Sequence, residues 1–333
     1  MDTISVVMPV FRCERFVATA VESILAQTYE KIELIIVCDD PSEQLKTILE
    51  ALKSADPRIS LVYQGRRGLI ASRNICCQLA SGKYIAMMDC DDISHPERLQ
   101  IQYEFLDSHP DVGLVGTWYD VIDESGIQID RFNSLTGADT LRWMFFFGNY
   151  IGHSTVMMRR ETLEKVNFYD ISLPGVSEDY ALYLKVLEIA DVDVIPQYLV
   201  RYRKHTHGVT GEKWSEMMAI ANDLRKKYIE RQIGHPIDRD TVVNMNVPSS
   251  IRSGEDLFKV INLIDELFKK YFDSRQISRT EKRAICDFLF KFQAYVAKSC
   301  SKSVPIESVI ALVLAYYSYN LKPRIYRNQI PSV

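Results

Sequence analysis

The sequence lacks the glycine-rich motifs by which the commonest nucleotide-binding enzymes hold phosphate. No Gly-x-Gly-x-x-Gly follows the first predicted strand, and neither Gly-Lys-Ser nor Gly-Lys-Thr occurs in the 333 residues. Because those glycines let the backbone approach phosphate closely, their absence argues against a dinucleotide-binding Rossmann domain and against a phosphate-loop NTPase.

Regular cysteine spacing and a membrane-length apolar run are also missing. The seven cysteines are an odd number without a framework pattern, which indicates a reducing compartment. A strand is predicted within the first five residues, so we expect no signal peptide and a cytoplasmic protein. The apolar stretch from Ser308 to Leu321 has 14 residues, too few for a transmembrane helix.

Charge is distributed unevenly along the chain, although the net charge is only −4. Residues 1–210 hold 20 Lys and Arg against 30 Asp and Glu, whereas residues 211–333 hold 20 against 14. The first part therefore carries a charge of −10 and the second +6, a division that predicts two units facing different partners.

Short apolar strands alternate with helical segments over the first ninety residues. The predicted strands span residues 4–8, 32–37, 59–63 and 84–88, and the predicted helices span residues 14–27, 45–52 and 70–79. Strands about 25 residues apart with helices between them predict βαβ units. We therefore expect an α/β fold in which a doubly wound parallel sheet is covered by helices on both faces.

Three aspartates follow the last of these strands, in the run Asp89-Cys90-Asp91-Asp92. Carboxylates this close repel one another and shift one another's pKa, so a cation normally holds them together. Oxygen ligands suit Mg²⁺ or Mn²⁺, and ligands bind at the carboxyl ends of parallel strands. A metal that bridges a phosphate is one interpretation. The other is an acidic loop that caps the helix expected after Pro96.

The other strand ends carry residue types that suit a nucleotide. A carboxylate can accept hydrogen bonds from a base or a ribose, an aromatic ring can stack on a base, and a guanidinium can neutralise phosphate. Each residue type also has an ordinary structural interpretation, since Asp39-Asp40-Pro41 is a turn sequence and Arg73 can pair with a surface acid. The candidates at these strand ends are Pro9, Phe11, Asp39, Asp40, Arg66, Arg67 and Arg73.

Several motifs occur in the order expected for one enzyme family. They are Ser5–Phe11, Ser23–Thr28, Gly68–Asn74, Gly82–Asp92, Pro96–Leu99, His153–Met157, Glu178-Asp179-Tyr180 and Tyr202–His205. Over residues 3–210 the chain resembles the family-2 glycosyltransferases with the GT-A fold, a fold that binds nucleotide sugars.

This resemblance implies an inverting sugar transferase that uses a nucleoside-diphosphate sugar, most often UDP-linked, together with Mn²⁺ or Mg²⁺. An acceptor hydroxyl is a poor nucleophile at neutral pH, so a carboxylate must take its proton as the new bond forms. By the match, Asp179 is this general base, and Asp91 with Asp89 or Asp92 supports the metal. His205 is expected to ligate the metal or to touch the diphosphate.

The resemblance also places His153 and Glu178 in the cleft for sugar and acceptor. Pro41 stands where the family usually has glycine, and Arg67 stands where it usually has asparagine, so the match says little about which nucleotide or sugar is bound. The chain lacks the Gln-x-x-Arg-Trp motif of processive synthases, and we expect one sugar to be added per encounter. The residues expected to bind the nucleotide sugar are Pro9, Phe11, Asp39, Asp40, Arg67, Arg73, Asp89 and Asp92.

Structural alternatives stay open for the candidate site residues. An ordinary helix N-cap would look the same as a base at Asp179, and His153 is equally well explained as a core histidine with satisfied hydrogen bonds. A lone histidine such as His205 is often a solvated loop residue, and His207 competes with it. The aromatic residues Trp118, Trp143 and Phe145 to Phe147 are expected in the core rather than as a sugar platform.

The remaining residues, 213–333, show helical periodicity and no strand, with residues 234–254 as the expected linker. Their apolar stripe predicts a helical bundle that packs on the catalytic domain. The alternative is that the basic helices, with the tyrosines at 316, 317 and 319, lie on an anionic membrane. The stripe comprises Leu257, Val260, Ile261, Ile264, Leu267, Phe268 and Tyr271, and the basic residues after the tyrosines are Lys322, Arg324 and Arg327.

The sequence therefore predicts a GT-A catalytic domain over residues 1–212 and a helical region over residues 213–333. We expect transfer to a glycan or lipid-carrier-linked acceptor for a bacterial cell-surface polysaccharide, at the inner face of the cell membrane and without a nucleic-acid partner. The residue types also suit two other classes of protein. A nucleotidyltransferase needs a glycine-rich loop after strand one, and a degenerate nucleotide-sugar-binding module would keep the fold without the activity.

Overall fold

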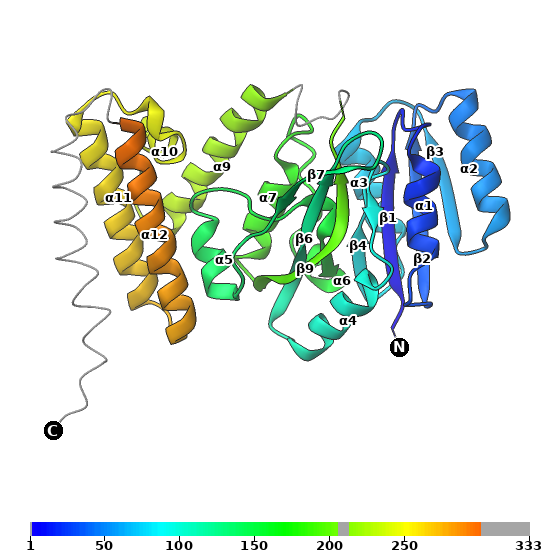
Figure 1. Cartoon of the computed structure of the whole chain (residues 1–333), viewed down its shortest axis with the longest axis horizontal. Coiled ribbons are helices and arrows are strands. Elements are labelled where there is room, and N and C mark those ends of the chain that lie inside the picture. Colours follow the sequence, from blue (N-terminus) through cyan, green and yellow to red (C-terminus); the bar gives the residue numbers. More distant parts are fainter. Residues whose placement is uncertain (1, 206–212, 301–333) are drawn as a thin grey trace. The chain divides into compact units, whose positions relative to one another are not determined.

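The computed structural model describes residues 2–205 and 213–300, and the chain divides into two compact units (Figure 1). The first unit comprises residues 1–142 and 149–221, and the second comprises residues 143–148 and 222–333. The division falls after residue 221 rather than after residue 212, and the segment 143–148 belongs to the second unit. His207, the tyrosines from 316 to 319, and Lys322, Arg324 and Arg327 lie outside the described residues.

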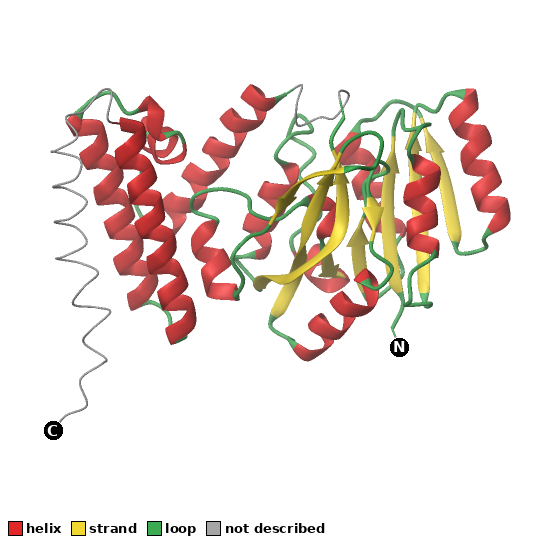
Figure 2. Ribbon diagram, viewed as in Figure 1, coloured by secondary structure: helices red, strands yellow, loops and turns green. Residues whose placement is uncertain are grey.

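The first unit is built on a nine-stranded sheet, drawn in yellow in Figure 2. Its first four strands in sequence order lie in the spatial order β3-β2-β1-β4 and are parallel. All seven residues of β1 are buried, as expected for a parallel strand covered on both faces. These strands confirm the four predicted ones: β1 (Ile4–Val10), β2 (Ile32–Asp39), β3 (Ile59–Gln64) and β4 (Tyr84–Met87).

The rest of the sheet is mixed, so the predicted parallel arrangement holds for only part of it. β8 (Met157–Arg159) lies antiparallel between β4 and β6 (Val112–Ile122), and β9 (Asp191–Arg203) runs parallel to β6. β5 (Ile93–Ser94) pairs with β9 and β7 (Gln128–Phe132) pairs with β6, both antiparallel. Strands as short as β5 and β8 carry too few residues for an alternating pattern.

Helices cover both faces of the parallel strands. Alternate residues of β1, such as Val6 and Met8, pack with residues of α1 (Val17–Leu25), α2 (Glu43–Ala55) and α4 (Arg98–Ser108). α3 (Leu69–Leu79) packs behind the same strands (Figure 1). The thiol of Cys76 in α3 donates a hydrogen bond to the carbonyl of Ile35 in β2. The other elements of this part of the chain are α5 (Ala138–Met144), the 3-10 turn η1 (His153–Thr155), α6 (Arg160–Lys165) and α7 (Glu178–Val186).

The second unit is helical over its described residues, as predicted. The apolar stripe lies in α11 (Gly254–Asp273), where its residues are buried apart from the half-buried Ile261. α11 begins with a capping box, in which the Ser253 hydroxyl accepts from the Asp256 N–H. The expected linker is partly wrong, because residues 234–254 contain a helix whose N-cap is Asp238. The remaining elements are α9 (Trp214–Ile233), which begins in the first unit, α10 (Arg239–Asn246), η2 (Pro248–Ser250) and α12 (Arg279–Cys300).

The aromatic segment 143–148 belongs to the core of the second unit, which confirms its predicted structural role. Trp143 is fully buried, and its ring meets that of Phe268 edge-on with the centroids 5.9 Å apart. Phe145, Phe146 and Phe147 are also buried. Across residues 2–205 and 213–300, no helix combines the length and the apolar character needed to cross a membrane.

Candidate active site

The acidic loop lies at the carboxyl end of β4, and its first carboxylate is surrounded by donors. Asp89 pairs with Arg73 Nη2 at 3.1 Å and accepts a hydrogen bond from the Ser154 hydroxyl at 3.1 Å. His153 Nδ1 lies 3.4 Å from the same carboxylate. Burial raises the pKa of Asp89, but His153 and Arg73 outweigh burial and hold that pKa well below its usual range. Asp89 is therefore ionised and charge-compensated by the protein itself.

Asp91 points toward the end of β9 and meets a histidine there. His205 Nε2 lies 2.9 Å from Asp91 Oδ2, and both residues are half-buried. Burial and the charge of Asp89 raise the pKa of Asp91, and His205 offsets part of this rise. The pair brings together a carboxylate, which suits Mg²⁺ and Mn²⁺, and an imidazole, the commonest metal ligand among side chains. The structure thus places two of the three sequence-predicted metal ligands in contact.

Asp92 faces inward from the same loop. It is 1% exposed, and its Oδ1 accepts from the Arg203 N–H at 2.7 Å. Burial, followed by the charges of Asp91 and Asp89, raises the pKa of Asp92 well above its usual range. Arg203 Nε also donates to the carbonyl of Asp91 at 2.8 Å, so the end of β9 is tied to the acidic loop.

Arg73 links this loop to a second pair of acids. Its side chain is 6% exposed and forms ion pairs with Asp89 through Nη2 and with Glu178 through Nη1. Glu178 is itself 8% exposed and opens α7. Arg73 comes from α3, so one buried guanidinium joins three elements that are distant in sequence. Its role in this structure is a bridge between carboxylates.

Asp179, beside Glu178, is half-buried in the first turn of α7. Its Oδ1 accepts from the Tyr180 N–H at 2.7 Å, and its Oδ2 accepts from Asn149 Nδ2 at 2.9 Å. Burial and the negative charge of Glu178 raise the pKa of Asp179 to about 6. A carboxylate with a pKa in this range is ionised at neutral pH and remains a competent proton acceptor. Sequence reasoning missed Asn149 as a partner of Asp179.

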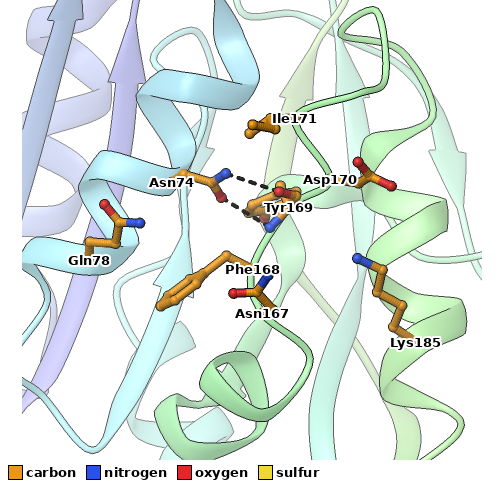
Figure 3. Close-up of a pocket in the computed structure, with 8 residues that line it drawn as sticks. All are labelled: Asn74, Gln78, Asn167, Phe168, Tyr169, Asp170, Ile171 and Lys185. Atoms are coloured by element: carbon orange, nitrogen blue, oxygen red, sulfur yellow. Dashed lines mark hydrogen bonds between the residues drawn. The ribbon is translucent and has the colours of Figure 1, made fainter.

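His153 is held from the opposite side by a tyrosine. Its Nε2 lies 2.9 Å from the Tyr169 hydroxyl, and the backbone of Tyr169 is clamped by two hydrogen bonds to the Asn74 amide, each 3.0 Å long. Figure 3 shows both bonds at the wall of a cavity of about 430 Å³ between α3, α7 and residues 167–171. His153 is thus both hydrogen-bonded and part of the acidic site, so neither sequence interpretation excludes the other.

The expected nucleotide contacts lie at the ends of the neighbouring parallel strands. Asp39 does not face solvent, because its two oxygens accept the N–H groups of Arg67 and Gly68 at 2.8 and 2.9 Å and so fix the turn after β3. Gly68 has a φ of +87°, which favours glycine at this point of the turn. Phe11 is 41% exposed, with the Arg12 guanidinium 4.9 Å from its ring centre.

The other expected contacts differ in how accessible they are. Asp40 and Arg67 are exposed at the same edge of the sheet, whereas Pro9 is buried within β1. No group of three or more His, Cys, Asp or Glu side chains is arranged to hold a metal ion in the described ranges. The arrangement therefore combines an exposed sheet edge, the Asp91–His205 pair and the half-buried carboxylate of Asp179.

The family model described as "Glycosyl transferase family 2" matches residues 5–167. Among curated proteins, the O-antigen biosynthesis glycosyltransferase WbnJ of Escherichia coli is 32% identical over 241 residues, which covers 70% of this chain and 92% of WbnJ. The UDP-Glc:alpha-D-GlcNAc-diphosphoundecaprenol beta-1,3-glucosyltransferase WfaP of Escherichia coli is 25% identical over 231 residues, which covers 68% of this chain and 86% of WfaP.

Two solved structures share the fold at low sequence identity. Residues 1–349 of S. aureus TarS in complex with UDP-GlcNAc superpose with a TM-score of 0.57 at 14% identity, covering 95% of this chain and 92% of that one. The mannosyltransferase PcManGT of Pyrobaculum calidifontis, in complex with GDP-Man and Mn²⁺, gives a TM-score of 0.50 at 15% identity, covering 96% and 81%.

Proposed function

Because the chain belongs to glycosyltransferase family 2, we propose that it transfers a sugar from a UDP-linked donor to a glycan or lipid-carrier-linked acceptor, with inversion at the anomeric carbon. The chain is thus a glycosyltransferase, and the nucleotidyltransferase alternative is set aside. The name of WfaP includes UDP-Glc, and the TarS structure is a complex with UDP-GlcNAc. Both support a UDP-linked donor. The diphosphoundecaprenol acceptor named for WfaP supports a lipid-carrier acceptor and a role in cell-surface polysaccharide synthesis.

The observation that carries the proposal is the environment of Asp179. Inversion in one step requires a base that removes the proton of the acceptor hydroxyl as the hydroxyl attacks. Asp179 is half-buried, and among the described residues it forms no ion pair with a lysine or arginine. The neighbouring Glu178 forms an ion pair with Arg73 instead. Of the two adjacent acids, Asp179 is therefore the one free to take a proton.

A divalent cation fits the Asp91–His205 pair, and we propose Mn²⁺ or Mg²⁺ there. Asp89 is already compensated by Arg73 and His153, whereas Asp91 has His205 as its partner. A divalent ion bound by one or two protein groups commonly takes its other ligands from substrate phosphates. When bound, such an ion stabilises the negative charge that grows on the departing diphosphate. The Mn²⁺ named in the PcManGT complex supports this choice.

The remaining residues divide into those that meet the nucleotide and those that hold its contacts in place. Phe11, Asp40 and Arg67 are exposed at the sheet edge, and we propose that they contact the nucleotide. Asp39 holds the turn that carries Arg67, and the buried Pro9 precedes Phe11 within β1. Supporting roles from within the protein are proposed for Arg73 and His153, which contact Asp89, for Glu178, which pairs with Arg73, and for Asp92, which accepts from the Arg203 N–H.

A donor screen tests this function directly. Thermal melting is measured with UDP-, GDP- and dTDP-sugars, each with and without Mn²⁺. A ligand at a hundredfold excess over its Kd stabilises the folded state by about 2.7 kcal/mol, which is readily detected. We expect a UDP-sugar to raise the melting temperature only in the presence of Mn²⁺ or Mg²⁺. Stabilisation by GDP- or dTDP-sugars alone would contradict the UDP assignment, and stabilisation independent of metal would contradict the cation site.

A further inference from the structure

The side-chain amide of Asn149 has a fixed orientation. Its Oδ1 accepts a hydrogen bond from the Ile151 N–H at 3.0 Å, so the carbonyl end is committed to the main chain. The Nδ2 end then points the other way and donates to Asp179 Oδ2 at 2.9 Å. An amide offers an acceptor at one end and donors at the other, so this arrangement allows only a donor to face Asp179.

Asp179 is held at both oxygens by two different parts of the chain. Oδ1 accepts from the N–H of Tyr180 in its own helix, while Oδ2 accepts from Asn149, 30 residues earlier in the sequence. A carboxylate group otherwise rotates freely about its last side-chain bond, because that torsion is broad. The hydrogen bond from Asn149 removes this freedom and leaves the remaining lone pairs in a defined direction.

The donor to Asp179 is neutral, and this matters for a base. An arginine in the same place would also orient the carboxylate, but its charge would lower the pKa and weaken the proton acceptor. The nearby arginine, Arg73, forms its ion pairs with Glu178 and Asp89 instead. Asn149 therefore supplies orientation without the loss of basicity that a cation would cause.

We propose that Asn149 is the positioning residue of the general base, and that its amide turns the Asp179 carboxylate toward the acceptor hydroxyl. The inference rests on the proposed role of Asp179. Asn149 does not itself touch the reacting atoms in this proposal. It acts through Asp179, so its removal should matter only while Asp179 is a carboxylate.

The pH dependence separates this role from a merely structural one. Loss of an N–H donor to the ionised form raises the pKa of a carboxylate, so the acid limb of the rate profile should move to higher pH. The other groups around Asp179 are unchanged by a substitution at Asn149. They are Glu178 and Tyr183 from α7, His153 from η1, Arg73 from α3, Tyr119 from β6 and Tyr169 from the segment before α7.

The experiment compares Asn149→Ala and the isosteric Asn149→Asp with Asp179→Asn and with the double variant Asn149→Ala/Asp179→Asn. We expect Asn149→Ala to lower kcat by about 10- to 100-fold, the effect of losing a hydrogen bond to an ionised group. Asn149→Asp should lower kcat at least as much, because it also places a second carboxylate beside Asp179. The KM for the donor should change by less than about twofold, because Asn149 is not expected to contact the bound donor. Asn149→Ala should have no further effect in the Asp179→Asn background.

Asn133→Ala is the matched control, since the Asn133 amide donates to the Tyr198 hydroxyl and does not contact Asp179. Its kcat and acid limb should equal those of the wild type. Thermal melting confirms that each variant is folded, and the isosteric Asn149→Asp keeps the test valid if Asn149→Ala does not fold. An unmoved acid limb, an unchanged kcat, or additive losses in the double variant would overturn the role of Asn149. Near wild-type transfer by Asp179→Asn would instead overturn the proposed base.

Discussion

Replacement of Arg73 by methionine should strongly destabilise the first unit. The guanidinium is 6% exposed and pairs with Asp89 and Glu178, whose side chains are 26% and 8% exposed. Methionine fills a similar volume but leaves two largely buried carboxylates without their shared cation. Removing one partner of a buried ion pair typically costs about 3–5 kcal/mol, because the remaining charge is uncompensated. We expect a loss of this size in the free energy of unfolding.

The assay is urea unfolding, and the chain offers a matched control. Arg160 pairs with Glu164 on the surface of α6, with 39% and 48% of the two side chains exposed. Arg160→Met should cost less than about 1 kcal/mol, as is usual for exposed pairs. Adding Glu178→Gln to Arg73→Met should recover part of the loss by removing one orphaned charge. If Arg73→Met costs no more than Arg160→Met, the buried bridge does not stabilise the site in the way described.

Three further predictions concern pH, metal and membrane. Since the pKa of Asp179 is raised to about 6 and the base acts when deprotonated, the transfer rate should fall as the pH drops below about 6, and a rate unchanged down to pH 4.5 would contradict this. Asp91→Ala should abolish the Mn²⁺-dependent stabilisation by UDP without unfolding the protein, and intact metal-dependent stabilisation would exclude Asp91 as a ligand. With a net charge of +6 in residues 211–333, the chain should sediment with anionic liposomes at low salt and be released at high salt. Replacing Lys322, Arg324 and Arg327 by glutamine should weaken this binding, and equal binding to neutral liposomes would contradict the prediction.

Much of the first unit could be predicted from sequence because its signals are local. The four parallel strands are short apolar runs bounded by turns, and their predicted positions agree with the structure to within two residues at either end. The acidic run at Asp89 and the acidic pair at Glu178 and Asp179 each lie at the end of one element. Residue type and spacing suffice to identify such features, since carboxylates at a strand end or a helix start are visible without knowledge of the fold.

The connections between these features could not be predicted, because they join distant parts of the chain. Arg73 meets Glu178 across 105 residues, and Asn74 clamps Tyr169 across 95. From its sequence, Arg73 was expected to neutralise phosphate or to pair with a surface acid, whereas the structure shows a buried bridge. Asn149 carries no sequence signal for its contact with Asp179. The antiparallel pairing of β8 with β4 and β6 could not be predicted either, because a strand of three residues shows no periodicity.

The central claim is that Asp179 removes the proton of the acceptor hydroxyl. Asp179→Asn keeps the shape of the side chain and removes its basicity, so donor binding measured by titration calorimetry should persist while the transfer rate falls by about 10²- to 10⁴-fold. Glu178→Gln is the comparison, since Glu178 is engaged by Arg73. Retained donor affinity with transfer lost in Asp179→Asn is the result that the proposed mechanism predicts. Near wild-type transfer by Asp179→Asn would contradict it.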